Sequence, residues 1–407
     1  MCRKFIVIGI PDDHRFVHDE QTVRLIHENR VFSGGKRHHE LMKPYLPEPC
    51  KWIDIAVPID DVFAQYALVE EPIVVFASGD PLFFGFAVTI RRKLPDAEIT
   101  VFPYFNSLQM LAHRLVMPYH DMHIVSLTGR PWHEFDAALI RLCPKIGVLT
   151  DGTHTPGVIA RRMLDFGYTY YNMSVGEHLG NPEQERVTTM ELTDAAERDF
   201  SQPNCVIIER KRMPESVRFP IPDALFEHLD GREKMITKAP IRLLTLAALE
   251  LNAKSSFWDI GFCTGSVSIE AKLHFPQLQV TAFEIREDGQ RLMNVNSRRF
   301  HAPGIEAVIG DFLQQDISRF PQPDAVFIGG HGGQLKAIIA KVLTVLRDDG
   351  VIVFNSVTSP VVSQLTSRKS SRQLWDEACT EFTLHQDPPL RIQLNDYNPI
   401  EILKARK

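Results

Sequence analysis

The sequence lacks paired cysteines, and it contains no long apolar run. Its six cysteines are scattered without any C-x-x-C pair, so neither a zinc site nor a disulfide framework is indicated and a reducing compartment fits best. The apolar run Phe5–Gly9 is too short for the core of a signal peptide or for a membrane span. We therefore expect a cytoplasmic protein with no metal site and no membrane partner.

An excess of basic residues is also missing. Lys and Arg number 45 against 51 Asp and Glu, which gives a net charge of -6. Because a phosphate backbone demands clustered Lys and Arg, we do not expect a nucleic-acid partner. The chain has 407 residues, 44% of them hydrophobic and 24% charged, which is typical of a soluble globular protein with two or three compact units.

A charged segment at residues 209–222 divides the chain. It carries three prolines and no apolar periodicity, as is typical of an exposed connection. We predict domains at 1–212 and 225–407, joined by a linker at 213–224. Both halves alternate short β-branched runs with helix-length amphipathic stretches, which predicts α/β layers, with a mostly parallel sheet in the second half. The strands are expected near residues 5–8, 73–76, 99–102, 124–127, 146–149 and 205–208, and then near 257–260, 280–285, 325–328 and 351–354.

The strongest local signal is the run Trp258–Glu270, in which an expected strand leads through a glycine turn into a helix. Glycine allows positive φ and close approach of a ligand, and a helix N-terminus offers unpaired N–H groups to an anion. The dinucleotide fingerprint G-x-G-x-x-G is absent, because Cys263 and Ser266 stand at its second and third glycine positions. Glu284 ends the next strand, where a carboxylate can accept hydrogen bonds from ribose hydroxyls.

This order, D-x-G-x-x-T-G, then a strand-end Glu, then Gly310-Asp311-Phe312, resembles the class I S-adenosylmethionine methyltransferases. The resemblance implies a Rossmann-like fold in which the glycine turn holds the methionine part, Glu284 the ribose, and Asp311 with Phe312 the adenine. Cys263 stands where many members have glycine, and we interpret it as a packing residue. The implied residues of the turn are Gly261, Phe262, Cys263, Thr264 and Gly265.

Three further elements narrow the family. The run Pro323–Gly333 lacks the [DN]PP[YF] element of amino-group methylases. Together with residues 231–242 and the closing run 398–404, it resembles the C15-methylating, decarboxylating domain of cobalamin biosynthesis over residues 225–407. That resemblance implies that Thr237 approaches the cofactor, although Thr237 also suits the N-cap of a following helix. Gly329 and Gly330 are candidate substrate neighbours, whereas we interpret His331 as a surface-loop residue.

The N-terminal half carries its own set of elements. In Val75–Gly85, Asp80 suits a helix N-cap and Pro81 the first helical position. With residues 33–38, 103–109, 126–130, 149–156 and 177–180, this run resembles the C5-methylating tetrapyrrole (precorrin) methylases over residues 1–212. The resemblance implies two α/β subdomains with S-adenosylmethionine in their cleft, held by Gly9, Gly79, Asp80 and Pro81. The first turn departs from the family pattern, since no second glycine follows Gly9.

Basic residues beside these turns raise a separate question. A precorrin carries many carboxylates and needs cationic donors around its rim. Arg37, His38 and Arg130 are therefore candidate substrate contacts, and ordinary surface salt bridges are the alternative. The neighbouring His38 and His39 do not predict a metal site, because adjacent residues of a helix point in different directions.

Taken together, the halves resemble the bifunctional precorrin methyltransferases of cobalamin biosynthesis, which implies methylation of C5 and C15 of precorrin-6, or its cobalt form, and loss of the C12 acetate carboxylate. Each half is expected to bind S-adenosylmethionine, and a homo-oligomer is expected because both parent families commonly assemble. No acid–base pair is needed, since the macrocycle itself supplies and absorbs electrons. The alternative is a methyltransferase acting on RNA or another small molecule through the C-terminal half alone, with the N-terminal half as a non-catalytic holder.

Overall fold

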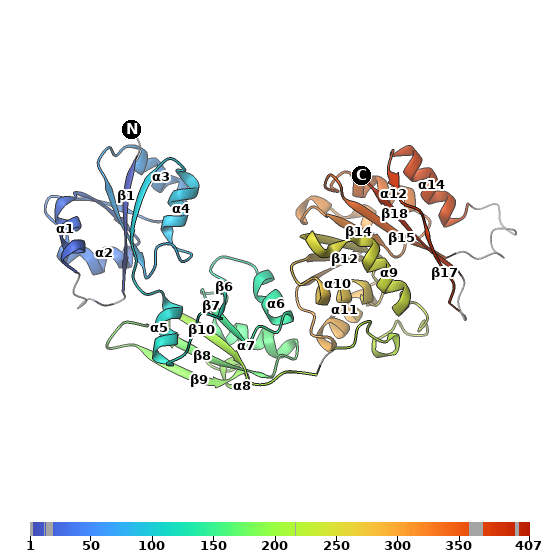
Figure 1. Ribbon diagram of the computed structural model, residues 1–407, viewed down its shortest axis with the longest axis horizontal. Helices are drawn as coiled ribbons and strands as arrows, with labels where there is room; N and C mark the ends of the chain where they lie inside the picture. Colours follow the sequence, from blue (N-terminus) through green and yellow to red (C-terminus); the bar gives the residue numbers. More distant parts are fainter. Residues whose placement is uncertain (1–2, 12, 14–18, 216, 358–368, 395–398) are drawn as a thin grey trace. The chain divides into compact units, whose positions relative to one another are not determined.

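The computed structural model describes residues 3–11, 13, 19–215, 217–357, 369–394 and 399–407. Asp12 of the first turn and Asn398 of the closing run fall outside these ranges. By their contacts the described residues form two units. Figure 1 shows the helices and strands, coloured in the order of the sequence. The first unit holds residues up to 130, 144–161 and 171–211, and the second holds 131–143, 162–170 and 212 onward.

The first unit begins with a five-stranded parallel sheet of order β3-β2-β4-β1-β5. Alternate residues of β1 pack into two different hydrophobic clusters, Phe5 and Val7 into one and Ile8 and Ile10 into the other. Both faces of the sheet are therefore covered, as a parallel sheet requires. The elements are β1 (Lys4–Ile10), α1 (Glu20–Glu28), β2 (Val31–Gly34), α2 (Lys36–Met42), η1 (Lys43–Tyr45), β3 (Lys51–Asp54), α3 (Ile59–Ala67), β4 (Ile73–Ser78), α4 (Phe86–Lys93) and β5 (Glu98–Phe102).

A second five-stranded sheet follows, of order β6-β7-β10-β8-β9. Here β10 runs antiparallel to both neighbours, whereas β6 and β7 are parallel. Leu108 and Leu111 of α5 pack with Cys205 and Ile207 of β10. The two α/β subdomains expected in the N-terminal half are thus present. The elements are α5 (Ser107–Arg114), β6 (His123–Ser126), α6 (His133–Ile140), β7 (Lys145–Leu149), α7 (Pro156–Asp165), β8 (Tyr171–Glu177), β9 (Arg186–Glu191), α8 (Leu192–Ala196) and β10 (Asn204–Arg210).

The C-terminal half contains an eight-stranded sheet of order β13-β12-β11-β14-β15-β18-β16, with β17 paired to β18. Strands β11 to β15 are parallel, and β18 is antiparallel to β15. The strand order reverses between β11 and β14, and in such sheets the ligand crevice opens at the carboxyl ends of the strands at that point. This mostly parallel, Rossmann-like sheet confirms the predicted fold class.

Its strands are β11 (Ser256–Ile260), β12 (Gln279–Glu284), β13 (Ile305–Ile309), β14 (Ala325–Ile328), β15 (Val351–Val357), β16 (His385–Gln386), β17 (Leu390–Ile392) and β18 (Ile400–Arg406). Its helices are η2 (Asp223–Leu225), α9 (Ala239–Leu249), η3 (Leu251–Ala253), α10 (Ser266–His274), α11 (Asp288–Arg299), η4 (Phe312–Gln314), η5 (Ile317–Arg319), α12 (Leu335–Leu343) and α14 (Ser371–Glu381). Among the described residues, no helix combines the length and apolar character needed to cross a bilayer.

Two predicted helix starts are wrong. Asp80 does not cap a helix, because its carboxylate accepts the N–H of Leu82 at 2.8 Å and closes a local turn, so that α4 begins later, at Phe86 after Gly85. Thr237 is not the N-cap of α9, which is Lys238. The first N–H of α9, that of Ala239, is instead bound by the distant carboxylate of Asp223 at 3.0 Å.

Candidate active sites

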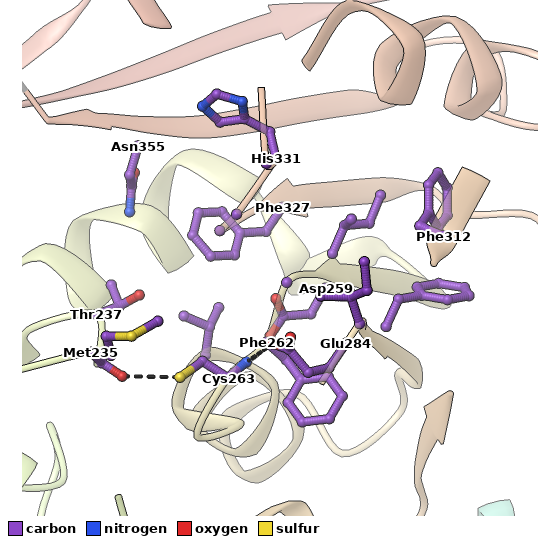
Figure 2. A pocket seen from close by; sticks show the side chains of 18 of the residues that line it. Met235, Thr237, Asp259, Phe262, Cys263, Glu284, Phe312, Phe327, His331 and Asn355 are labelled. Carbon is purple, nitrogen blue, oxygen red and sulfur yellow. Dashed lines mark hydrogen bonds between the residues drawn. The ribbon is translucent and has the colours of Figure 1, made fainter. Parts of the chain in front are cut away.

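A cavity of about 400 Å³ opens at the carboxyl ends of β11, β12 and β14, where the strand order reverses (Figure 2). Nearly all the residues predicted for the C-terminal site line it. Thr264 and Gly265 are exceptions, because Thr264 is buried and Gly265 forms the N-cap of α10. The predicted residues on the cavity wall are Thr237, Gly261, Phe262, Cys263, Glu284, Asp311, Phe312, Gly329 and Gly330.

At the glycine turn, a Cβ would collide with backbone atoms of the neighbouring loop. Gly261 has φ +80°, and a Cβ there would lie 2.7 Å from the N of Gly330. Gly329 in turn packs against the carbonyl of Gly261, since its Cβ would lie 3.0 Å from that oxygen. The glycines after β11 and β14 are therefore required by the close approach of the two loops, in addition to bordering the cavity.

Cys263 has φ +51°, in the left-handed region that favours glycine. Glycine would adopt this conformation without the steric cost that the Cβ of Cys263 imposes. Its thiol donates to the carbonyl of Met235 at 3.1 Å, and burial raises the pKa of the thiol to about 11. A neutral, hydrogen-bonded thiol agrees with the predicted packing role and not with a nucleophile.

Glu284 lies buried at the end of β12. One carboxylate oxygen accepts the main-chain N–H of Cys263 at 2.8 Å, and the other accepts the N–H and guanidinium of Arg286 at 3.1 and 2.9 Å. A carboxylate offers about four acceptor positions. These three bonds therefore orient Glu284 and leave capacity for a ligand hydroxyl.

Asp259 is a cavity residue that the sequence interpretation did not select. It lies in β11, its Oδ2 accepts from Ser268 Oγ at 2.6 Å, and its buried Oδ1 has no hydrogen-bond partner among the described residues. Burial raises the pKa of this carboxyl to about 7. The acidic position of the D-x-G motif was the signal that could have identified it.

The far wall of the cavity holds two more side chains that were missed. His331, interpreted as a surface-loop residue, is half-buried on the wall. It accepts the N–H of Gly333 through Nδ1 at 3.0 Å, and burial lowers its pKa. Asn355 also lines the cavity and donates to Thr245 Oγ1 at 2.9 Å. His331 lies within the run Pro323–Gly333 but was assigned to the surface, whereas Asn355 lies beyond the runs that the family motifs cover.

Lys341 orients the segment that carries Asp311 and Phe312. Its ammonium donates to the carbonyls of Phe312, Leu313 and Gln315 at 3.0, 2.8 and 2.6 Å. It also lies 5.4 Å from the centre of the Phe312 ring. A helix residue thus holds the turn after β13 against the cavity.

The first unit contains a second cavity of about 260 Å³, lined by residues of both of its subdomains. Gly79 and Arg37 lie on its wall, but Gly9, Asp80, Pro81, His38 and Arg130 do not. Ile10 and Pro11 line it in place of Gly9, which belongs to strand β1 and pairs with Ala77. The prediction that Gly9 forms a glycine turn is therefore wrong. A Cβ at Gly9 would lie 1.9 Å from the carbonyl oxygen of Gly79, so this glycine admits the loop that follows β4.

The three basic residues predicted to contact the substrate in the first unit have different partners. Arg37 and His38 both reach Ser78 Oγ, at 2.7 and 2.9 Å, beside the cavity. The guanidinium of Arg130 lies 5.0 Å from the centre of the exposed Phe84 ring. The structure therefore brings Arg37 and His38 together and places Arg130 on a separate aromatic surface.

Asp151 fixes the loop that lies beside this second cavity. Burial acts to raise the pKa of its carboxyl, but the N–H groups of Gly129, His154 and Thr153 hold that pKa well below its usual range. The bonds are 2.9, 2.6 and 2.8 Å long. The ionised carboxylate therefore joins the turns after β6 and β7.

A glycine turn, an orienting strand-end Glu and a buried Asp at the reversal of a parallel sheet define a class I S-adenosylmethionine-dependent methyltransferase, here preceded by a second α/β unit with a cavity of its own. The model of the precorrin methyltransferase domain matches residues 224–373. The precorrin-6Y C(5,15)-methyltransferase [decarboxylating] of a Sinorhizobium species is 34% identical over 369 residues, which cover 88% of this chain and 86% of the relative. The chain belongs to the family of decarboxylating precorrin-6Y C5,15-methyltransferases.

Shorter relatives match about half of the chain each. A cobalt-precorrin-6B C(15)-methyltransferase (decarboxylating) of Salmonella typhimurium is 40% identical over 187 residues, 46% of this chain and 95% of the relative. A cobalt-precorrin-7 C(5)-methyltransferase of the same organism is 26% identical over 206 residues, 50% of this chain and 98% of the relative. The two functions thus exist in separate proteins that together match both halves of this chain.

Proposed function

We propose that this protein methylates C5 and C15 of precorrin-6, or its cobalt form, and removes the carboxylate of the C12 acetate. The observation that carries the proposal is the presence of two separate cavities, one in each unit, in a chain that matches a bifunctional relative along 88% of its length. We assign C5 methylation to the N-terminal half, residues 1–212, and C15 methylation with decarboxylation to residues 225–407.

The C-terminal cavity fits S-adenosylmethionine, which when bound supplies an electrophilic methyl group. The unpartnered Oδ1 of Asp259 is a buried acceptor suited to the ammonium of the methionine part. Gly261 to Gly265 and the start of α10 would receive its carboxylate. Glu284 would accept from the ribose hydroxyls, Asp311 and Phe312 would border the adenine, and Thr237 would close the site.

The second cavity would hold the cofactor of the N-terminal unit at Gly79, with Gly9, Asp80 and Pro81 shaping the loop. Arg37, His38 and Arg130 would bind substrate carboxylates, because cationic donors form the strongest hydrogen bonds to these groups. In the C-terminal cavity, Gly329 and Gly330 would leave room for the macrocycle. We further propose that the enzyme is cytoplasmic and self-associates, which its mass in solution tests.

The chemistry asks the chain mainly to align reactants and exclude water. A reduced macrocycle presents an enamine-like carbon to the methyl group, and it absorbs the electron pair when the carbon–carbon bond to the carboxylate breaks and carbon dioxide leaves. Asp259 and Glu284 therefore act by holding the cofactor and need not move a proton. We assign no general acid or base.

The decisive experiment incubates the full chain with S-adenosylmethionine and precorrin-6B or its cobalt form, and reads the products by mass. The proposal expects a gain of two methyl groups and a loss of one carbon dioxide. A gain of one methyl without that loss contradicts it.

Counting binding sites separates this proposal from the alternative in which the N-terminal half is only a holder. Equilibrium dialysis of the full chain with S-adenosylhomocysteine should find two sites per chain. A single site would favour the holder and leave the C-terminal half as the only methyltransferase, acting on a macrocycle or another small molecule.

A further inference from the structure

Residues 221–238 lead to one wall of the C-terminal cavity and contain little regular structure. Their one helical element is the short turn η2, and the rest of the segment runs as loop to the start of α9. The cavity is lined by residues 234–238 at the end of this segment, among them Met235 and Thr237. The position of this loop therefore decides the width of the cavity on that side.

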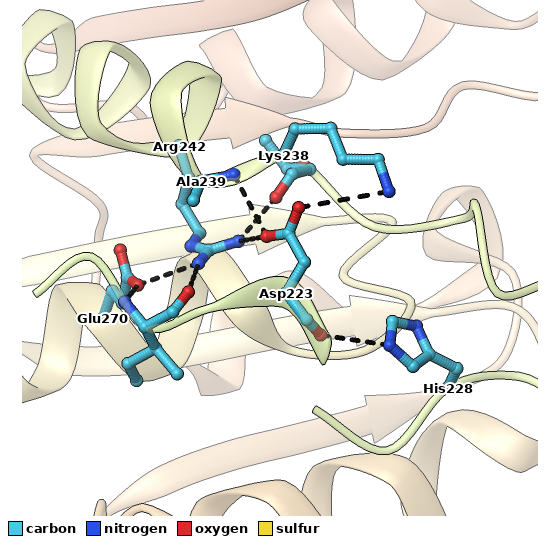
Figure 3. A network of polar contacts seen from close by, with 8 residues as sticks. Asp223, His228, Lys238, Ala239, Arg242 and Glu270 are labelled. Carbon is cyan, nitrogen blue, oxygen red and sulfur yellow. Dashed lines mark hydrogen bonds and ion pairs between the residues drawn. The ribbon is translucent and has the colours of Figure 1, made fainter. Parts of the chain in front are cut away.

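Arg242 of α9 connects the two ends of the segment (Figure 3). One guanidinium nitrogen donates to the carbonyl of Ile221 at 2.5 Å, and the other donates to the carbonyl of Thr237 at 2.6 Å. The side chain is 0% exposed. A single buried cation thus closes residues 221–238 into a strap.

Two carboxylates fasten the same cation and the strap together. Glu270 accepts from Arg242 at 2.9 Å and from the N–H of Ile221 at 2.6 Å. Asp223 accepts from Arg242 at 3.1 Å and from the N–H of Ala239 at 3.0 Å. Each carboxylate therefore binds the guanidinium and a main-chain N–H at a junction of the strap.

Two buried polar atoms of this network form no hydrogen bond to any described residue. The Nε of Arg242 and the Oε2 of Glu270 have no hydrogen-bond partner among the described residues. Buried ion pairs of this kind contribute little to stability compared with an apolar pair of similar volume. What the guanidinium provides, and an apolar side chain cannot, is simultaneous hydrogen bonding to two carbonyls 16 residues apart in the sequence.

We propose that Arg242 is a positioning residue for the C-terminal cofactor site, and that it acts by holding the 221–238 strap as a wall of that site. The strap is fixed at a second point, where the thiol of Cys263 donates to the carbonyl of Met235. The glycine turn and the strap are therefore joined on the wall of the cavity. The inference deepens the proposed function, on which it rests.

The test compares Arg242→Met, which removes every donor, with Arg242→Lys, which keeps a cation. In Arg242→Met we expect the KM for S-adenosylmethionine in C15 methylation to rise roughly tenfold or more, since hydrogen bonds to charged groups are of that size. The kcat at saturating cofactor should change much less, and Arg242→Lys should recover part of the affinity. C5 methylation by the other unit is an internal control and should keep its KM.

Lys272→Met is the matched control. Lys272 is also 0% exposed and donates to two carbonyls, those of Pro276 and Leu278, but neither of these residues lines the cavity, whereas Thr237 does. We expect it to lower stability without a selective rise in the KM of C15 methylation. Hydrogen exchange should quicken at residues 221–238 in Arg242→Met and not in Lys272→Met. An unchanged KM in Arg242→Met, or an equal rise in Lys272→Met, overturns the inference.

If Arg242→Met does not fold, Asp223→Ala provides a second test. Asp223 is partly exposed, and its loss leaves the ion pair between Glu270 and Arg242 intact. For this variant we expect a smaller rise, of about threefold, in the KM for S-adenosylmethionine in C15 methylation. An unchanged KM again overturns the inference. If the wild-type chain fails to methylate precorrin, the proposed function fails instead. Calorimetric affinity for S-adenosylhomocysteine then tests the strap independently.

Discussion

The carboxylate of Glu284 accepts the main-chain N–H of Cys263 across 2.8 Å, which joins the end of β12 to the glycine turn after β11. The same carboxylate holds Arg286 through its second oxygen. One buried side chain therefore sets the shape of the turn and, in the proposed complex, binds the ribose. Loss of its charge should affect both.

Glu284→Gln should weaken the binding of S-adenosylmethionine to the C-terminal site roughly tenfold to a hundredfold. The amide keeps one acceptor oxygen and replaces the other with a donor facing Arg286. The KM for C15 methylation measures this loss of affinity. The exposed neighbour Glu287→Gln is the control and should behave like the wild type. Equal affinities in the two variants would remove Glu284 from the site.

Because the carboxyl of Asp259 has a raised pKa, we expect the cofactor affinity of the C-terminal site to depend on pH. Burial raises the pKa of its carboxyl to about 7, and the ammonium of the cofactor favours the ionised form. The KM for C15 methylation should therefore fall as the pH rises from 6 to 8, with a proton released on binding. Asp259→Asn should bind weakly at every pH and lose this dependence. A parallel pH profile in the variant contradicts the assignment.

Because of the same raised pKa, we expect the stability of the ligand-free chain to fall as the pH rises, whereas its cofactor affinity increases. The pKa of the Asp259 carboxyl is about 7 in the folded chain and near 3.9 when unfolded, so its contribution is fully present below about pH 4. It is lost as the pH rises through about 7. Relative to Asp259→Asn, the ligand-free wild type should lose on the order of 2 to 4 kcal/mol over that interval. Urea unfolding at pH 5 and pH 8 measures the difference.

Gly9→Ala should abolish C5 methylation and spare C15 methylation. A methyl group at this position would lie 1.9 Å from the carbonyl oxygen of Gly79 and 2.7 Å from the N of Tyr104, so the loop beside the second cavity must move. Gly152→Ala is the control in the same unit, since its Cβ would meet only Gln202 at 3.8 Å. Retention of C5 methylation in Gly9→Ala would show that the loop tolerates displacement.

Cys263 should resist alkylation. Burial raises the pKa of its thiol to about 11, and the thiolate is the reactive form. With iodoacetamide at neutral pH, the exposed Cys50 should be modified first and Cys263 much more slowly, as read by peptide mass. Rapid modification of Cys263 would show that the thiol does not stay bound to the carbonyl of Met235.

Arg37→Ala and Arg130→Ala should each weaken binding of the precorrin in C5 methylation, by roughly tenfold where a charge-assisted hydrogen bond is lost. The KM for the macrocycle is the measurement, with Arg92→Ala on the exposed last turn of α4 as the control. Unchanged affinity in both variants would leave these residues as ordinary surface cations.

Much of the fold could be predicted from local patterns. All the predicted strands exist, because β-branched runs bounded by turn residues report strand formation directly. Strands β2, β3, β8, β9, β16, β17 and β18 were missed. β2 has only four residues, all of them buried, and contains Ser33 and Gly34, so neither alternation nor length distinguishes it. The helix starts at Asp80 and Thr237 were predicted wrongly because the deciding hydrogen bonds come from a local turn and from Asp223.

The sequence by itself determined the class of the protein and most of the residues on the wall of the C-terminal cavity, because these motifs follow strand ends and chain order places those ends at one edge of a parallel sheet. Only the tertiary structure decided that Gly9 admits the loop of Gly79, that one oxygen of Asp259 finds no hydrogen-bond partner in the described part of the chain, and that Arg242 bridges Ile221 and Thr237. Each of these depends on burial or on contacts between atoms remote in the chain. Packing sets such contacts, and no local pattern records them.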